Sequence, residues 1–155
     1  MRGLKCAATL FICSAALFAA DNPFLGTWKL NVAKSKGTPG TMEKEATTVY
    51  EADGDKIKRT YTAIDADGKP VKMADSIQWD GKPHQVSGGE GMPPAMVAVK
   101  RINDRTVDVT VKVNGKVVAA GRSVVSMDGK TMTESFKGED PKGRKFDNVG
   151  VSEKQ

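Results

Sequence analysis

The chain has 155 residues, of which 28% are charged, and 24 Lys and Arg face 19 Asp and Glu. This length is typical of one domain, and the interleaved charges form no basic stripe with aromatic residues, which argues against nucleic-acid binding. Both cysteines lie within the first 20 residues, and without them the single histidine His84 leaves too few nitrogen and sulfur ligands for a structural zinc site.

Residues 1–20, MRGLKCAATLFICSAALFAA, are expected to be a signal peptide. Arg2 and Lys5 accompany an apolar run that is too short for a membrane span, and small residues crowd its end. The cut is expected after Ala16, Ala19 or Ala20. Removal of the signal peptide discards both cysteines and lowers the net charge from +5 to +3. The remaining domain, 21–155, is then periplasmic or secreted, with no stable membrane span.

Asx-Gly pairs recur along this domain and predict a series of hairpin turns, because Gly and Asx tolerate the positive φ that tight turns require. The pairs are Asp53-Gly54, Asp67-Gly68, Asp80-Gly81, Asn114-Gly115 and Asp128-Gly129. No long segment has a helical period, and Thr41 to Ala46 allow one helical turn at most. We expect strands at 24–31, 45–52, 56–64, 69–79, 83–87, 95–102, 105–113, 116–126, 131–137 and 144–153.

A long run of sequential hairpins must protect its sheet edges, and closure into a barrel is the simplest solution. The expected fold is therefore all-β: a single antiparallel up-and-down barrel of about 8–10 strands, with little or no helix after the signal peptide. Residues 32–43 would form a long connection, and residues 88–94, GGEGMPP, a flexible loop.

The first expected strand, FLGTWKLN, places Phe24, Gly26, Trp28 and Leu30 on one face, which we expect to be core. Gly26 would permit a close backbone approach. Trp28 is expected to plug the closed end of the barrel.

FLGTWKL resembles the opening strand of the fatty-acid-binding proteins and, through Gly-x-Trp, of the wider lipocalin (calycin) superfamily. The stretches VSEKQ and GRSVVSMDGK resemble the last strand and the penultimate hairpin region of the fatty-acid-binding proteins. The resemblance implies a closed barrel that carries a small apolar or amphipathic ligand. Arg122 matches a carboxylate-binding arginine of that family if two further residues are allowed before the DGK turn.

Two features depart from that family. Residues 32–43 are too short and too rich in Gly and Pro for its two-helix lid. Gly150 and Ser152 stand where its last strand offers an Arg-x-Tyr pair to a carboxylate. The barrel is compatible with both departures, whereas fatty-acid binding as such is not supported by them.

Polar residues on otherwise apolar strand faces mark the candidate ligand site. A turn centred near Asp67 would oppose Arg59 to Asp75 and Tyr61 to Met73. Such groups on apolar walls are typical of a ligand cavity. The alternative is that Arg59 and Asp75 form a structural ion pair and that Glu134 is a carboxylate at the barrel mouth, each in contact with water. The predicted ligand-contacting residues are Arg59, Tyr61, Met73, Asp75, Trp79, Arg122 and Glu134.

No motif for catalysis, a metal or a cofactor emerges. DADGKPVKMADS places Gly68 two positions too early for a calcium loop, GRSVV around Ser123 lacks the nucleophile elbow, and His84 beside a turn is typical of a surface residue rather than a haem ligand. The expected function is an exported barrel that binds a hydrophobic or amphipathic ligand. Two alternatives are a filled structural barrel acting through its loops and an enzyme using Asp75 or Glu134.

Overall fold

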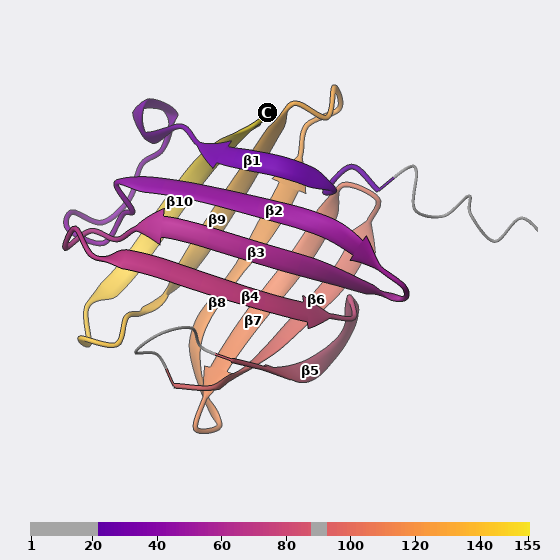
Figure 1. Cartoon of the computed structure of the whole chain (residues 1–155). Helices are drawn as coiled ribbons and strands as arrows, with labels where there is room; N and C mark the ends of the chain where they lie inside the picture. Colours follow the sequence, from indigo (N-terminus) through magenta and orange to yellow (C-terminus); the bar gives the residue numbers. More distant parts are fainter. Residues whose placement is uncertain (1–21, 88–92) are drawn as a thin grey trace, which may run out of the picture.

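The computed structural model describes residues 22–87 and 93–155; the expected signal peptide and most of the expected loop 88–94 lie outside them. As predicted, the fold is an all-β, up-and-down barrel (Figure 1). Its strands are β1 (Gly26–Leu30), β2 (Glu45–Asp53), β3 (Lys56–Ile64), β4 (Pro70–Ile77), β5 (Asp80–Val86), β6 (Ala95–Asn103), β7 (Thr106–Val113), β8 (Lys116–Val125), β9 (Thr131–Glu139) and β10 (Lys145–Lys154). In the described part of the chain, no helix has both the length and the apolar character that a membrane crossing requires.

The strands form one antiparallel sheet in the order β4-β3-β2-β1-β10-β9-β8-β7-β6-β5. Each strand pairs with its neighbour in sequence except at the β4–β5 connection, and β1 pairs with β10. The edge strands β4 and β5 approach one another but share no ladder among the described residues, so the barrel is nearly closed.

One local prediction is wrong. Asp80-Gly81 forms no hairpin, because Gly81 has a φ of 80° at a register shift between β5 and β6, where the strand bulges. Thr41 to Ala46, where one helical turn at most was expected, contain none, since β2 already begins at Glu45. The single turn of 3-10 helix, η1 (Val32–Lys34), follows β1 instead, and the Asn31 side chain accepts a hydrogen bond from the Lys34 amide at its start.

The register of β3 and β4 is the one that the Asp67 turn predicts. Arg59 lies opposite Asp75, and Tyr61 lies opposite Met73. Exposure alternates residue by residue along β4, from exposed Pro70 to buried Ile77. This alternation fixes which side chains face the inside of the barrel.

The two ends of the barrel differ. At the end where β1 begins, which we call the closed end, Phe24 and Trp28 are each only 1% exposed and belong to the apolar core. Trp28 Nε1 donates a hydrogen bond to the Phe24 carbonyl at 2.7 Å. The opposite end, the open end, carries the β1–β2 connection and the β3–β4, β7–β8 and β9–β10 turns (Figure 1).

Gly26 has a different role from the one expected. Its φ is +118°, a conformation that is essentially restricted to glycine. A Cβ at this position would meet the Lys154 side chain at 2.8 Å, so the close neighbour is a side chain and not a backbone.

Candidate ligand-binding cavity

An internal cavity of about 440 Å³ lies between the strands. This volume falls within the roughly 300–1,000 Å³ that is usual for small-molecule sites. Most of its lining is apolar, including Phe24, Met73, Trp79, Phe136, Phe146 and a series of valines on β6 and β7. The polar residues of the lining are Tyr50, Arg59, Asp75, Ser87, Ser123, Glu134, Glu139 and Asp140.

One wall of the cavity carries an ion pair from β3 and β4. Arg59 Nη2 donates to Asp75 Oδ2 at 2.5 Å, and the Asp75 side chain is only 4% exposed. Arg59 Nε and Asp75 Oδ1 have no hydrogen-bond partner among the described residues. Burial by itself lowers the pKa of Arg59, but Asp75, together with Tyr50 and Glu134, outweighs burial and holds the pKa above its usual value. Arg59 therefore stays charged.

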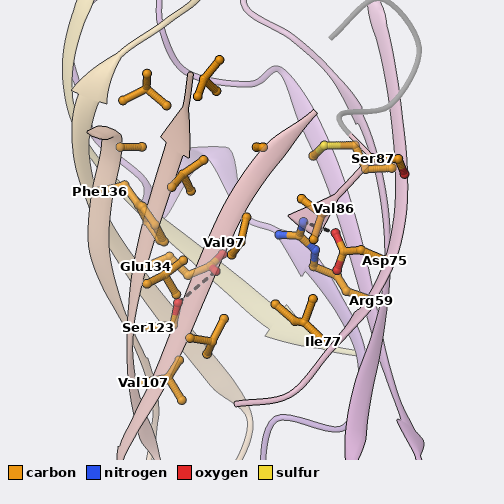
Figure 2. Close-up of a pocket in the computed structure, with 18 of the residues that line it drawn as sticks. Arg59, Asp75, Ile77, Val86, Ser87, Val97, Val107, Ser123, Glu134 and Phe136 are labelled. Atoms are coloured by element: carbon orange, nitrogen blue, oxygen red, sulfur yellow. Dashed lines mark hydrogen bonds and ion pairs between the residues drawn. The ribbon is translucent and has the colours of Figure 1, made fainter. Parts of the chain in front are cut away.

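The facing wall carries a buried carboxyl group from β9 (Figure 2). Ser123, opposite Glu134 in the β8–β9 ladder, donates its hydroxyl to Glu134 Oε1 at 3.2 Å. Burial raises the pKa of Glu134, and the Ser123 hydrogen bond and the charge of Arg59 lower it only in part. The neutral form of Glu134 is thus favoured relative to a carboxyl in water.

Aromatic side chains lie next to the ion pair. Tyr50 lies opposite Arg59 in the β2–β3 ladder, and its ring makes an edge contact with Trp79 at a centroid distance of 6.0 Å. Phe24 contacts Trp79 in the same way at 5.1 Å. Burial raises the pKa of Tyr50 above its usual value, so the phenol stays neutral and can donate a hydrogen bond.

The structure brings together five of the seven predicted ligand-contacting residues. Those that line the cavity are Arg59, Met73, Asp75, Trp79 and Glu134. Tyr61 is not part of the lining, and its hydroxyl donates a hydrogen bond to Glu43 Oε1 at 3.2 Å. Burial is the main cause that raises the pKa of Tyr61, and the charge of Glu43 raises it further.

The placement of Arg122 in the ligand site is wrong. Its neighbours Ser123 and Val125 are buried, so the alternation along β8 turns Arg122 outward. The side chain is 54% exposed and forms a two-pronged ion pair with Asp108, at 2.6 and 3.0 Å, on the outer wall.

Tyr50 and Ser123 belong to the cavity but were not predicted. The signal for both is the hairpin register. Counting back from the Asp53-Gly54 turn pairs Tyr50 with Arg59, and counting back from Asp128-Gly129 pairs Ser123 with Glu134.

The described residues form no cluster suited to a metal ion, and the histidine lies outside the cavity lining. Within residues 22–87 and 93–155, no group of three or more His, Cys, Asp or Glu side chains is placed to hold a metal ion. His84 does not line the cavity, and its Nε2 lies 2.9 Å from Asp80 Oδ1. The polar chemistry of the described lining is that of Arg59, of the acidic residues Asp75, Glu134, Glu139 and Asp140, and of neutral hydroxyl groups.

Ion pairs connect two turns at the open end. Lys142 Nζ lies 2.6 Å from Asp67 Oδ2, and Arg144 Nη2 lies 3.2 Å from the same oxygen. Arg144 Nε also donates to Asp140 Oδ2 at 2.6 Å. Since Asp140 and Pro141 line the cavity, we call this cluster of Asp67, Asp140, Lys142 and Arg144 the turn clamp.

Comparisons with known proteins bear on the fold. No protein-family model and no curated protein matches the chain. A fatty acid binding protein of Schistosoma mansoni, in complex with arachidonic acid, superposes with a TM-score of 0.59 at 14% identity, over 87% of this chain and 98% of that one. The zebrafish ileal bile acid-binding protein, complexed with cholic acid, gives a TM-score of 0.49 at 12% identity, over 86% and 98%. From the first superposition and its own ten-stranded topology, the chain has the calycin-type β-barrel fold.

Proposed function

We propose that this protein binds one small, largely apolar ligand inside its barrel. The observation that carries the proposal is the cavity of about 440 Å³, whose walls are apolar except for a few placed polar groups. The fold supports it, because the similar Schistosoma mansoni protein holds arachidonic acid.

Affinity would come mainly from removing the apolar part of the ligand from water, at about 25 cal/mol per Å² buried. Met73, Trp79 and Phe136 supply apolar and aromatic contacts. The polar groups of Arg59 and Glu134, on facing walls, would orient the polar end of the ligand. Binding, rather than catalysis, is the proposed activity, because Asp75 is already engaged in an ion pair with Arg59.

The filled-barrel alternative requires a lumen that interior side chains occupy. The cavity argues against it. A barrel acting through its loops would nevertheless keep its partners when the cavity is blocked, so the two functions differ in a direct test.

Export is the second part of the proposal and rests on residues 1–20. Expression of the full chain in a Gram-negative host, followed by fractionation and intact mass measurement, tests it. A periplasmic or secreted product cut after Ala16, Ala19 or Ala20 supports export, and an uncut cytoplasmic product contradicts it.

Native mass spectrometry of the product of the full gene, purified without lipid removal, tests ligand binding. We expect an added mass that denaturation releases. Val109 lines the cavity, so Val109→Phe should abolish the added mass. The matched change Val124→Phe, at an exposed position on β8, should leave it unchanged. An added mass that survives Val109→Phe would contradict binding in the barrel.

A further inference from the structure

We propose that the polar end of the ligand is an uncharged hydrogen-bonding group, such as a hydroxyl or ketone, and that the cavity selects against carboxylates and amines. This inference rests on the proposed function and specifies the ligand class for the same cavity.

The first argument is that the cavity offers no unneutralised positive charge. Among the described residues that line the cavity, Arg59 is the only basic one, and its guanidinium is paired with the Asp75 carboxylate at 2.5 Å. The other ionisable residues of the described lining besides Tyr50, namely Glu134, Glu139 and Asp140, are acidic. A ligand carboxylate would therefore lose its hydration and face acidic groups without gaining a free cation.

The second argument excludes a cationic end. The Asp75 carboxylate, the acid nearest to Arg59, already accepts a hydrogen bond from it. The charge of Arg59 acts on Glu134 across the cavity, so an ammonium group placed between them would be repelled by Arg59. Burial also favours the neutral form of Glu134, so the acid that faces Arg59 offers an amine less negative charge, and Asp140, another acid of the lining, is already paired with Arg144.

The third argument is that neutral polar groups have partners on both walls. Only Nη2 of the Arg59 guanidinium is used in the ion pair, and the group projects into the cavity (Figure 2). Glu134 receives the Ser123 hydrogen bond on Oε1, which leaves Oε2 to donate as a neutral acid or to accept. A hydroxyl or carbonyl between these walls gains hydrogen bonds without adding a charge.

The outer wall carries the same pair of residue types and serves as a control. Arg122 and Asp108 form an exposed ion pair on β8 and β7 and do not line the cavity. Substitution of Asp108 changes the charge of the protein by the same amount as substitution of Asp75 but leaves the cavity intact.

Titration calorimetry of the full-length gene product, stripped of bound lipid, with dodecanol, dodecanoate and dodecylamine is the test. We expect dodecanol to bind at least about tenfold more tightly than either charged probe. Asp75→Asn frees the charge of Arg59 and should improve dodecanoate relative to dodecanol by about tenfold. Asp108→Asn should leave the ratio of the two affinities unchanged. Arg59→Gln, which leaves Asp75 unpaired, should instead favour dodecylamine.

Each outcome has a distinct meaning. If wild-type protein prefers dodecanoate or dodecylamine, or binds all three equally, the neutral-ligand inference is overturned while binding in the barrel stands. If the wild-type preference holds, the inference stands even when Asp75→Asn or Arg59→Gln fails to fold. If no probe binds and the native protein carries no added mass, both the proposed function and the inference fall.

Discussion

The closed end and the open end of the barrel are held together by different forces. At the closed end, Phe24 and Trp28 are buried and joined by a hydrogen bond from the indole to a carbonyl. At the open end, the turn clamp joins two hairpins through partly exposed ion pairs. Apolar burial stabilises strongly, whereas exposed ion pairs stabilise weakly and are screened by salt. This difference suits a barrel that stays folded at one end while a ligand exchanges through the other.

The largest effect should come from truncating a closed-end aromatic residue. Phe24→Ala removes a ring that is 1% exposed and should lower the free energy of unfolding by about 3–5 kcal/mol. Phe146→Ala, the matched change near the open end, should cost clearly less, because Phe146 is only half-buried, although both rings line the cavity. Urea denaturation of both variants measures the difference. Equal losses would refute the assignment of stability to the closed end.

A backbone change at the closed end should rank second. Gly26→Ala forces alanine into a φ of +118° and places its Cβ 2.8 Å from the Lys154 side chain. We expect a loss of about 1–3 kcal/mol in the free energy of unfolding. Gly129→Ala, in a β8–β9 turn with a φ of +70° and open space around the Cβ, is the control and should lose less. A larger loss for Gly129→Ala than for Gly26→Ala would mean that the start of β1 tolerates a side chain.

Glu134 lies in the wall between the two ends, and its substitution should stabilise the protein in a pH-dependent way. The folded pKa is raised above the ordinary value of 4.5 by burial, so both states hold the proton at low pH and folding then carries no ionisation penalty. As the pH rises above 4.5, the unfolded chain ionises more readily than the folded chain, and wild-type stability falls until the raised pKa is passed.

Glu134→Gln removes this penalty. Its advantage in the free energy of unfolding should be absent near pH 4, should grow as the pH rises and should then level off, as followed by urea denaturation. Glu153→Gln is the control of opposite sign, because Lys34 holds the pKa of Glu153 below its usual value. A pH-independent effect of Glu134→Gln would contradict the buried-acid assignment.

The fold was predictable because turn chemistry repeats along the chain. Four of the five Asx-Gly pairs lie at hairpin turns, and three of these fix the register of two whole strands, whereas Asn114-Gly115 fixes it only as far as a bulge in β8. The exception, Asp80-Gly81, lies at the start of β5, next to the point where the edge strands β4 and β5 meet without forming a ladder with each other. A dipeptide signal alone does not distinguish a hairpin from a bulge, since both use positive φ.

The site was predictable only where a single turn fixed its register. The Arg59–Asp75 pair follows from the Asp67 turn. Arg122, in contrast, lies between two turns, and counting from one turn places its side chain inside the barrel while counting from the other places it outside. Counting from Asn114-Gly115 fails because β8 bulges near Val118, which shifts every residue beyond it by one position. The turn clamp joins residues some 75 positions apart, Asp67 and Lys142, which no local pattern encodes.

The smallest effect on stability, and the sharpest test of the open end, should come from Asp67→Asn. The Lys142 and Arg144 hydrogen bonds hold the pKa of Asp67 below its usual value, but the group is solvent-exposed, so its loss should barely shift the urea midpoint. Because Asp67 tethers the turn that contributes Asp140 to the cavity lining, the variant should release dodecanol faster in stopped-flow displacement. High salt should raise the wild-type rate toward that of the variant, since salt screens exposed ion pairs. Asp108→Asn on the outer wall should leave the rate unchanged. If Asp67→Asn and Asp108→Asn release the ligand equally, the ligand does not leave past the turn clamp, and the gap between β4 and β5 becomes the exit to test.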